Sequence, residues 1–314
     1  MKRAAAYAAL ACLFACSAEP RHEPEEPGED ARQAYEETAE RLATRFLDAG
    51  QVVSRLHGEP YHLGDSLIWT GIAAGAMPCR LVAPIEDALI ANIESNAGHV
   101  VRFRPLPDEY RGGREASLDG VLGLWSGIAK LAKRCGIGPH WANAFEMHVT
   151  TVLESGEVYP GAANASVVPW FATVLRQLSC RAGSGACPSS GDRLALAAAV
   201  SSWAYVVKQT QSAAYRIHLG YLALSTLEDA GADVGRERGM FCTATLGVGM
   251  PLIDHWCGRD GLAEWLAGFQ WNAQEYALQR GPWESADGRE GLETPGLDRL
   301  VALDTLFNFG GELK

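Results

Sequence analysis

The chain contains 314 residues, of which 47% are hydrophobic and 21% charged, and its formal net charge is −11. This length suffices for one large domain with a substantial hydrophobic core. The strong negative charge argues against nucleic acid and anionic lipid headgroups as partners, since both are bound by basic surfaces.

The first residues of the chain are typical of an export signal. A lysine and an arginine precede an unbroken apolar stretch at residues 4–15, which is too short to span a bilayer as a helix. The end of this stretch, LFAC, resembles the lipobox of bacterial lipoproteins, in which the cysteine becomes lipidated. The resemblance implies a signal peptide at residues 1–15 and a lipid anchor on Cys16. The alternative is an ordinary secretory signal that is cleaved after Ala15 or Ala18.

Residues 16–32 differ sharply in composition from the signal. They are rich in proline and charge and contain almost nothing to bury, so we expect a disordered tether between the lipid and the folded part. Residues 33–314 are expected to form a single domain, in which no segment has about 18 uninterrupted apolar residues. These features predict a protein of the cell envelope that is anchored by lipid, at the outer membrane or at a periplasmic face.

The cysteines predict disulfides. Two of the eight lie in the signal and at the anchor, which leaves an even set, and an even set in an exported protein indicates disulfides in an oxidising compartment. Cys180 and Cys187 bracket a short loop of small residues, RAGSGA, and we expect them to pair. Other connectivities are open. A zinc site is the alternative, but no CxxC pair or HExxH motif supports it, and we predict no metal. The simplest pairing of the remaining four cysteines joins Cys79 to Cys135 and Cys242 to Cys257.

The pattern of apolar residues predicts helices along almost the whole domain and no clear strands. The connection at residues 228–239 is too short and too rich in glycine for a predicted helix. In chain order, helices with one polar face are expected at residues 31–57, 84–95, 141–154, 192–210 and 262–279. Helices that are apolar nearly all round are expected at residues 65–77, 119–132, 166–178, 215–227, 242–253 and 297–309.

These two kinds of helix alternate along most of the chain. An (α/α)6 toroid, in which outer helices wrap a ring of inner helices, explains that alternation directly. The glycine and alanine residues of the apolar segments would let the inner helices approach closely around the ring axis. We therefore predict an all-α domain with this toroid architecture, and an irregular all-α bundle is the alternative.

The segment at residues 61–132 carries two motifs in succession. The first begins YHLGDSLIWTG, and the second, SLDGVLGLWSG, follows a glycine-rich basic loop. This order resembles bacterial α/α-toroid proteins of the carbohydrate-active kind, in which a GDSLL helix precedes an SRDQ helix. The resemblance implies the toroid fold and a carbohydrate polymer as the partner. Leu118 departs from the motif, because the family has arginine at this position.

Two aspartates occupy corresponding positions in these motifs. Asp65 and Asp119 each begin a predicted inner helix, so the resemblance implies that they face one cleft. A pair of carboxylates is what glycoside hydrolysis requires, one protonated as general acid and the other ionised as base or nucleophile. The alternative role is helix capping, because aspartate is a common residue at the first turn of a helix.

Further polar and aromatic residues lie in the loops and first turns that lead into the predicted inner helices. His218 closely follows Tyr215 and Arg216, and a histidine or tyrosine base beside an arginine is also the chemistry of polysaccharide lyases. The alternative for His218 is a buried imidazole with a satisfied hydrogen bond. The candidates for substrate binding are His62, Arg114, Tyr215, Arg216, His218, Trp283 and Asp298.

The sequence thus predicts a surface or periplasmic lipoprotein whose toroid binds a glycan and hydrolyses it with paired carboxylates. A non-catalytic scaffold or binding protein is the alternative of a different class. A polysaccharide lyase ranks below the hydrolase, because an acidic protein suits a polyanionic substrate poorly. No P-loop, dinucleotide fingerprint or GxSxG motif occurs, so we expect no cofactor and no nucleic acid partner.

Overall fold

The computed structural model describes residues 29–61, 63–161, 167–183, 185–269, 271 and 290–307. The predicted signal peptide, the predicted lipidation site Cys16 and two predicted substrate-binding residues, His62 and Trp283, lie outside these ranges. Within them α-helices dominate and strands are few and short, which confirms the all-α class. None of the described helices is both long enough and apolar enough to cross a membrane.

The described part of the chain forms twelve α-helices, with short strands and 3-10 helices between some of them. The α-helices are α2 (Glu29–Arg45), α3 (Ser66–Ala76), α4 (Ala83–Ser95), α5 (Leu118–Arg134), α6 (Pro139–Ser155), α7 (Pro169–Arg181), α8 (Ser190–Thr210), α9 (Tyr215–Asp229), α10 (Gly235–Thr245), α11 (Pro251–Trp256), α12 (Leu262–Ala267) and α13 (Leu297–Phe307). The strands are β1 (Leu47–Asp48), β2 (Gln51–Val52), β3 (Ser54–Leu56), β4 (Glu59–Tyr61) and β5 (Leu292–Glu293), and the 3-10 helices are η1 (Leu63–Asp65), η2 (Cys79–Leu81) and η3 (Asp108–Tyr110).

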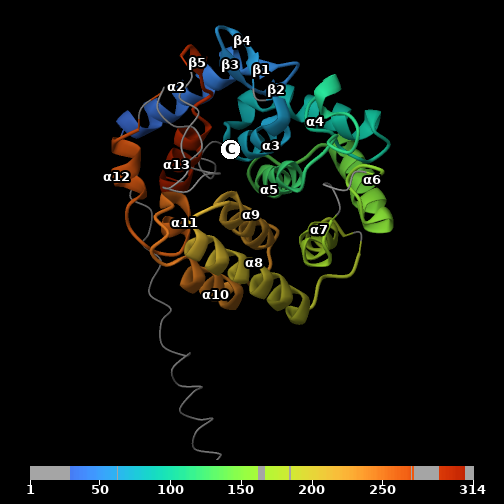
Figure 1. Ribbon diagram of the computed structural model, residues 1–314. Helices are drawn as coiled ribbons and strands as arrows, with labels where there is room; N and C mark the ends of the chain where they lie inside the picture. The colour runs from blue at the N-terminus through green and yellow to red at the C-terminus, as the bar shows by residue number, and fades with distance from the viewer. Residues whose placement is uncertain are drawn as a thin grey trace, which may run out of the picture.

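Figure 1 shows helices in two layers around a common centre. The inner helices α3, α5, α9 and α13 lie toward the middle, and α2, α4, α6, α8, α10 and α12 lie outside them. α3 is buried along its whole length and packs between α5 and α13. α13 also packs against α2, so the last described helix contacts the first two.

Glycines let α3 and α5 touch backbone to backbone. A Cβ atom on Gly127 of α5 would clash with the carbonyl group of Gly71 in α3, so only glycine fits at this crossing. One end of the same interface joins Gly120 of α5 to Leu67 of α3. The contacting positions increase together in both helices, so α3 and α5 run parallel. Their first turns therefore lie side by side.

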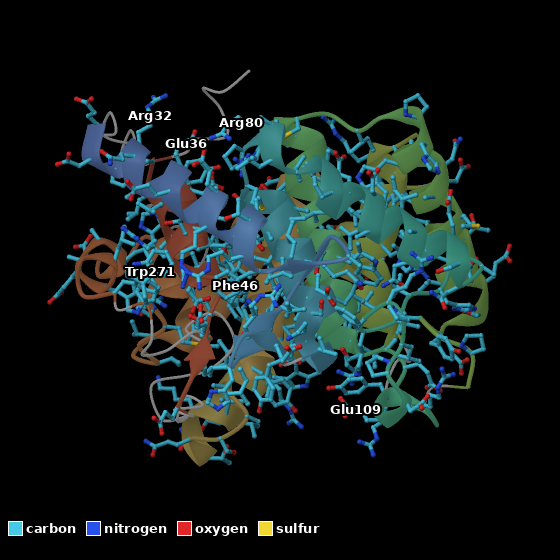
Figure 2. The ribbon with its side chains drawn as sticks, turned by 90° about the horizontal axis from the view of Figure 1, so that it is seen from above. Arg32, Glu36, Phe46, Arg80, Glu109 and Trp271 are labelled. Carbon is cyan, nitrogen blue, oxygen red and sulfur yellow. A yellow bond between two sulfur atoms is a disulfide. The ribbon has the colours of Figure 1, made fainter. Side chains whose placement is uncertain are left out.

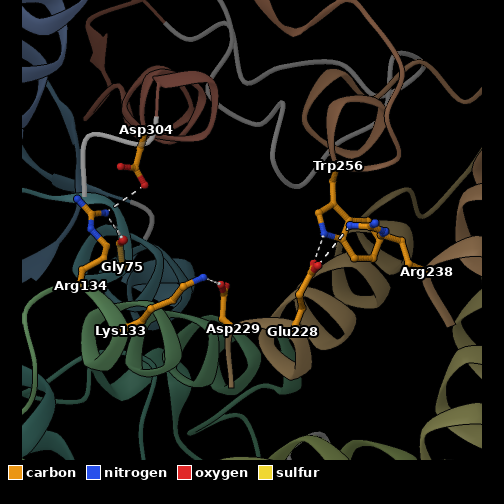
Figure 3. A network of polar contacts seen from close by, with 8 residues as sticks. All are labelled: Gly75, Lys133, Arg134, Glu228, Asp229, Arg238, Trp256 and Asp304. Atoms are coloured by element: carbon orange, nitrogen blue, oxygen red, sulfur yellow. Dashed lines mark hydrogen bonds and ion pairs between the residues drawn. The ribbon is translucent and has the colours of Figure 1, made fainter. Parts of the chain in front are cut away.

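The C-terminal ends of the inner helices meet in a network of charged side chains (Figure 3). Arg134 of α5 donates to the backbone carbonyl of Gly75 in α3 at 2.5 Å and to the carboxylate of Asp304 in α13 at 3.0 Å. Beside it, Lys133 of α5 donates to Asp229 at the end of α9, at 3.3 Å. The last carbonyls of a helix lack partners within the helix, so cations are favourable there. These four helices run in one direction, and we call this end the C-terminal rim and the opposite end, where they begin, the N-terminal rim.

Helix α2 runs in the opposite direction to the inner helices. Near its start, the Tyr35 hydroxyl donates to the carbonyl of Ala76, the last residue of α3, at 2.8 Å. At its end, Arg45 forms an ion pair of 2.6 Å with Glu293 of β5, shortly before α13 begins. The first residues of the described chain therefore lie at the C-terminal rim.

The two rims lie at opposite edges of the molecule in Figure 2. Arg80 of η2, which directly follows α3, pairs with Glu36 of α2 at the upper edge. Glu109 of η3, in the loop that precedes α5, lies at the lower edge. The first described residues and this loop are thus separated by the length of the inner helices.

Three disulfides join the cysteines in the pairs that the sequence predicts as the simplest set. One of them connects η2 to the residue that follows α5, and so reinforces the C-terminal rim. The second closes the short loop after α7, and the third connects α10 to the end of α11. The pairs are Cys79–Cys135, Cys180–Cys187 and Cys242–Cys257.

The helix predicted at residues 31–57 is wrong in its second half. α2 ends at Arg45, and residues 47–61 form two antiparallel hairpins, β1 with β2 and β3 with β4. Their turns require positive φ angles, which Gly50 and Gly58 adopt at 78° and 88°. β5 pairs with β3 and adds a third strand to the second hairpin.

The helix predicted at residues 242–253 is also wrong. This segment contains the end of α10, a turn and the start of α11. Gly247 and Gly249 adopt φ angles of 76° and 77° in the turn, which a continuous helix does not allow. α10 itself begins at Gly235, inside the connection for which no helix is predicted.

Two helix ends differ from the expected bounds as well. α2 begins at Glu29, so the last residues of the predicted tether, 16–32, are helical. α12 ends at Ala267, whereas the prediction continues to residue 279, in a segment that is largely outside the described ranges.

Candidate functional site

A polar pocket lies at the N-terminal rim, where the loops that lead into α3 and α5 meet. Its volume is about 270 Å³. One predicted catalytic residue and one predicted substrate-binding residue, Asp65 and Arg114, are among the residues that line it. The described lining consists of Gly64, Asp65, Arg102, Tyr110 and Arg114.

Arg102 ties the two loops of the pocket together. Its backbone N–H donates to the carbonyl of Glu115 at 2.8 Å, and its Nε donates to the carbonyl of Arg114 at 2.7 Å. On the other side, its Nη1 donates to the carbonyl of Gly64 at 3.0 Å, just before α3. The guanidinium also lies 5.8 Å from the centre of the Tyr110 ring. Within the described chain its hydrogen-bond acceptors are backbone carbonyls, and its positive charge has no carboxylate partner there.

Tyr110 forms one wall of the pocket and explains why residue 64 is glycine. A Cβ atom at Gly64 would lie 2.8 Å from the Tyr110 hydroxyl oxygen, so a side chain there would displace the phenol. Burial raises the pKa of Tyr110, and the nearby carboxylates of Glu109 and Asp65 raise it further. The phenol therefore stays protonated at neutral pH, and the Glu109 carboxylate accepts its hydrogen bond.

The glycine-rich loop before α5 binds its own carboxylate. The two carboxylate oxygens of Glu115 accept from the backbone N–H groups of Gly112 and Gly113, at 2.9 and 2.8 Å. Although burial opposes it, the set of backbone hydrogen bonds lowers the pKa of Glu115. Glu115 is thus held by the loop, and within the described chain it does not pair with Arg114.

The two predicted catalytic aspartates begin neighbouring parallel helices. Asp65 occupies the N-cap position of α3 but makes no capping hydrogen bond with its side chain. Asp119 lies in the first turn of α5, where Ser117 is the cap and accepts from the N–H of Gly120 at 3.3 Å. Asp119 is not among the described residues that line the pocket. Neither carboxylate therefore serves as the side-chain cap of its helix, although both lie near positive helix ends.

The predicted residues of α9 are divided between the surface and the core. Tyr215 is 45% exposed, and the exposed guanidinium of Arg216 lies 5.9 Å from the centre of its ring. His218 is 1% exposed, and neither of its nitrogens has a hydrogen-bond partner in the described chain. Burial, together with the nearby charge of Lys130, lowers the pKa of His218 to about 3. None of the three residues of α9 is among the described lining of the pocket.

The last predicted contact, Asp298, is a core residue. It lies in the first turn of α13 and is 4% exposed. It belongs to the N-terminal rim, but the described lining of the pocket does not include it. The structure therefore unites Asp65 and Arg114 and leaves the other described candidates outside the pocket.

Two pocket residues, Arg102 and Tyr110, were missed by sequence reasoning. Both lie between α4 and α5, in a long connection whose only regular element is the short η3. The first recognisable pattern in this connection is the glycine-rich run that begins at Arg111, which follows both residues in the chain. A long loop without secondary structure is itself a functional signal, and that signal could have drawn attention to the arginine and the tyrosine.

Comparisons of the chain with protein-family models, with curated protein sequences and with solved structures find no match.

Proposed function

We propose that this protein is a lipid-anchored protein of the cell envelope whose helical domain, an (α/α)6 toroid, binds a glycan at the N-terminal rim and hydrolyses it. The pocket that Asp65 lines, at the point where α3 and α5 begin side by side, carries this proposal. Each part of the proposal has its own support and its own test.

Support for the toroid comes from the order and direction of the helices. Inner and outer helices follow each other along the chain from α2 to α6 and from α8 to α9 (Figure 1). The four inner helices α3, α5, α9 and α13 end at one charged network. α13 packs against α2 and α3, as closure of a ring requires.

Support for glycan binding comes from the chemistry of the pocket. Sugars present many hydroxyl groups, which donate and accept hydrogen bonds, and an aromatic wall favours their apolar faces. The pocket offers a carboxylate from Asp65, guanidinium donors from Arg102 and Arg114, and the protonated phenol of Tyr110. A volume of about 270 Å³ suits one sugar unit, with the rest of a polymer outside.

In the proposed hydrolysis, Asp65 and Asp119 act as the pair of carboxylates. One in its protonated form donates to the glycosidic oxygen, while the other activates a water or attacks the anomeric carbon. A spacing of about 5 Å would give retention of configuration, and about 6.5–9.5 Å would give inversion. The parallel first turns of α3 and α5 support the pairing of these two residues.

A second candidate is a glycan-binding protein without catalysis. The observation that favours it is the position of Asp119, which the described pocket lining does not include. Leu118 also favours the non-catalytic candidate, because it replaces the arginine of the family motif.

The direction of α2 adds an orientation to the proposal. The chain enters the domain at the C-terminal rim, and the pocket lies at the opposite edge of the molecule. A tether from a lipidated Cys16 would therefore reach the domain on the side away from the pocket. The pocket would then face away from the membrane, toward an external polymer.

The test compares the full-length protein with Asp65→Asn and Asp119→Asn variants on a panel of oligosaccharides. Asp108→Asn is a matched control, because Asp108 is an exposed carboxylate near the pocket that pairs with Arg111. Hydrolysis that disappears in both variants and persists in the control, with unchanged melting temperatures, supports the hydrolase. Binding without turnover identifies the second candidate, and no binding to any oligosaccharide refutes both. Products with a new ultraviolet-absorbing double bond would identify a lyase instead.

A further inference from the structure

We infer that the glycan bound at the N-terminal rim carries a carboxylate, as a uronic acid does, and that Arg102 and Arg114 bind that group. This inference rests on the proposed function and names its substrate class. The chain as a whole is acidic, with a formal charge of −11, so the arginines of the pocket are a local exception.

The first support is the charge balance of the pocket. Its described lining contains two guanidinium groups and one carboxylate, that of Asp65. Glu115, the carboxylate next to Arg114 in sequence, is bound by the N–H groups of Gly112 and Gly113. The guanidinium groups that line the described pocket therefore outnumber its lining carboxylates, and a further carboxylate close by, that of Glu109, is engaged by the phenol of Tyr110.

The second support is the way the charges of the neighbouring loop are used. Arg111, close to Arg114 in the same loop, forms an ion pair of 2.8 Å with Asp108. Arg114 is exposed and has no such partner among the described residues, and the same is true of the half-buried Arg102. The two arginines that line the pocket are therefore the ones that have no carboxylate partner among the described residues.

The third support is the rigidity of Arg102. Its guanidinium is fixed from both sides, by the carbonyl of Gly64 at 3.0 Å and by that of Arg114 at 2.7 Å. A planar guanidinium that is already oriented binds a carboxylate through paired hydrogen bonds and loses little conformational freedom. Its remaining N–H groups have no partner in the described chain, so they are free to donate to a ligand.

The acidity of the whole chain does not oppose this arrangement at short range. At about 0.1 M salt, charges more than about 10 Å apart in solvent are largely screened. A carboxylate within the pocket therefore responds mainly to the charges of the surrounding loops, which are Arg102, Arg114, Asp65 and Glu109 beside Tyr110. The net charge of −11 acts on the remainder of the polymer, which favours a glycan in which acidic sugars are separated by neutral ones.

The test uses full-length protein in detergent and pairs of oligosaccharides, each uronate-containing glycan beside its carboxyl-reduced neutral counterpart. Wild-type protein is expected to bind the acidic member at least about tenfold more tightly, since a hydrogen bond to a charged group contributes about 1.5–3 kcal/mol. Arg114→Gln is expected to reduce that preference severalfold, because Arg102 remains. Arg111→Gln is the matched control, an arginine of the same loop that is already paired, and it is expected to preserve the preference.

Arg102 requires a second variant because it also holds the loops. Arg102→Gln removes the positive charge, whereas Arg102→Lys keeps a charge but loses the planar guanidinium. Both variants are expected to bind the uronate-containing glycan more weakly than the wild type, and the lysine variant is expected to lose less affinity. Melting temperatures show whether either variant disturbs the fold, and the Arg114→Gln result stands independently of them.

The outcomes separate this inference from the proposed function. Equal binding of acidic and neutral members by the wild type, with no effect of Arg114→Gln, overturns the inference and leaves glycan binding intact. Binding of free glucuronate that depends on Arg114, without binding of any oligosaccharide, supports carboxylate recognition and refutes the glycan proposal. Absence of binding to oligosaccharides and to glucuronate overturns both.

Discussion

The indole N–H of Trp125 in α5 donates to Nε2 of His148 in α6 at 3.0 Å, in a part of the core where both side chains are fully buried. The other imidazole nitrogen, Nδ1, donates to the carbonyl of Gly98 at 2.7 Å. These two bonds fix a neutral tautomer. Burial lowers the pKa of His148 to about 4, although the bond to Gly98 opposes the shift. His148 is therefore a structural residue.

The first prediction compares the two buried histidines. His148→Leu removes both hydrogen bonds and leaves the N–H of Trp125 and the carbonyl of Gly98 unsatisfied, so we expect a loss of about 2–4 kcal/mol in the free energy of unfolding. His218→Leu breaks no described hydrogen bond, and we expect a change within about 1 kcal/mol of zero, or a gain. Urea denaturation at pH 7.5 measures both. A large loss in His218→Leu would show that its imidazole has a partner outside the described residues.

The second prediction concerns acid. The pKa of His148 is lowered to about 4 and that of His218 to about 3, whereas both are near 6.5 in the unfolded chain. Between the folded and unfolded pKa values, the unfolded chain binds protons that the folded protein does not. The free energy of unfolding is therefore highest above about pH 6.5 and falls as the pH drops. The expected slope approaches about 1.4 kcal/mol per pH unit for each histidine. Urea midpoints from pH 7.5 to 4.5 measure it, and a flat profile would contradict the neutral, buried state of both.

A variant supplies the control for this pH dependence. His218→Leu removes one of the two titrating groups, so its stability is expected to fall less steeply than that of the wild type over the same pH range. An unchanged slope would assign the acid sensitivity to other groups.

The third prediction tests the contact between α3 and α5. Gly127→Ala places a Cβ atom against the carbonyl group of Gly71, and because backbone cannot yield there, the helices must separate. We expect a loss of at least about 2 kcal/mol, in line with other overpacked cores. Gly239→Ala in α10 is the matched control: apart from the backbone of its own helix, nothing lies within 4 Å of the added Cβ. This helical substitution is expected to stabilise by about 0.5–1 kcal/mol. If the two variants denature alike, the close approach of α3 and α5 is refuted.

The fourth prediction tests the lipid anchor. Cys16→Ser is expected to abolish incorporation of a labelled fatty acid and to move the protein from the membrane fraction to the soluble fraction, because Cys16 is the residue that carries the lipid in the proposed anchor. Cys12→Ser, a cysteine substitution within the same apolar stretch, is expected to leave labelling unchanged. Labelling that persists in Cys16→Ser would refute the anchor, and cleavage after Ala18 would identify the ordinary secretory signal.

The site was predictable only in part. Asp65 was found because a motif marks the start of α3, and Arg114 because a glycine-rich loop marks the start of α5. His218 lies on a helix that reads as apolar, and its burial shows that a polar residue in such a helix need not face a cleft. Arg102 and Tyr110 reach the pocket through the folding of a long loop, and no periodic pattern encodes that path.

The sequence by itself determined the helical class, most helix starts and the presence of disulfides, because these depend on local periodicity, caps and an even set of cysteines, whereas the pairing of the cysteines stayed open. The tertiary structure alone decided where α2 stops: Val53 is fully buried directly after β2, where its backbone N–H donates to the carbonyl of Phe46, although its spacing also fits a helix. It also decided which polar residues share the pocket. Arg102 meets Gly64 only because α3 and α5 lie parallel and bring their preceding loops together. Contacts between residues distant in the chain are set by packing, and packing is a property of the whole core.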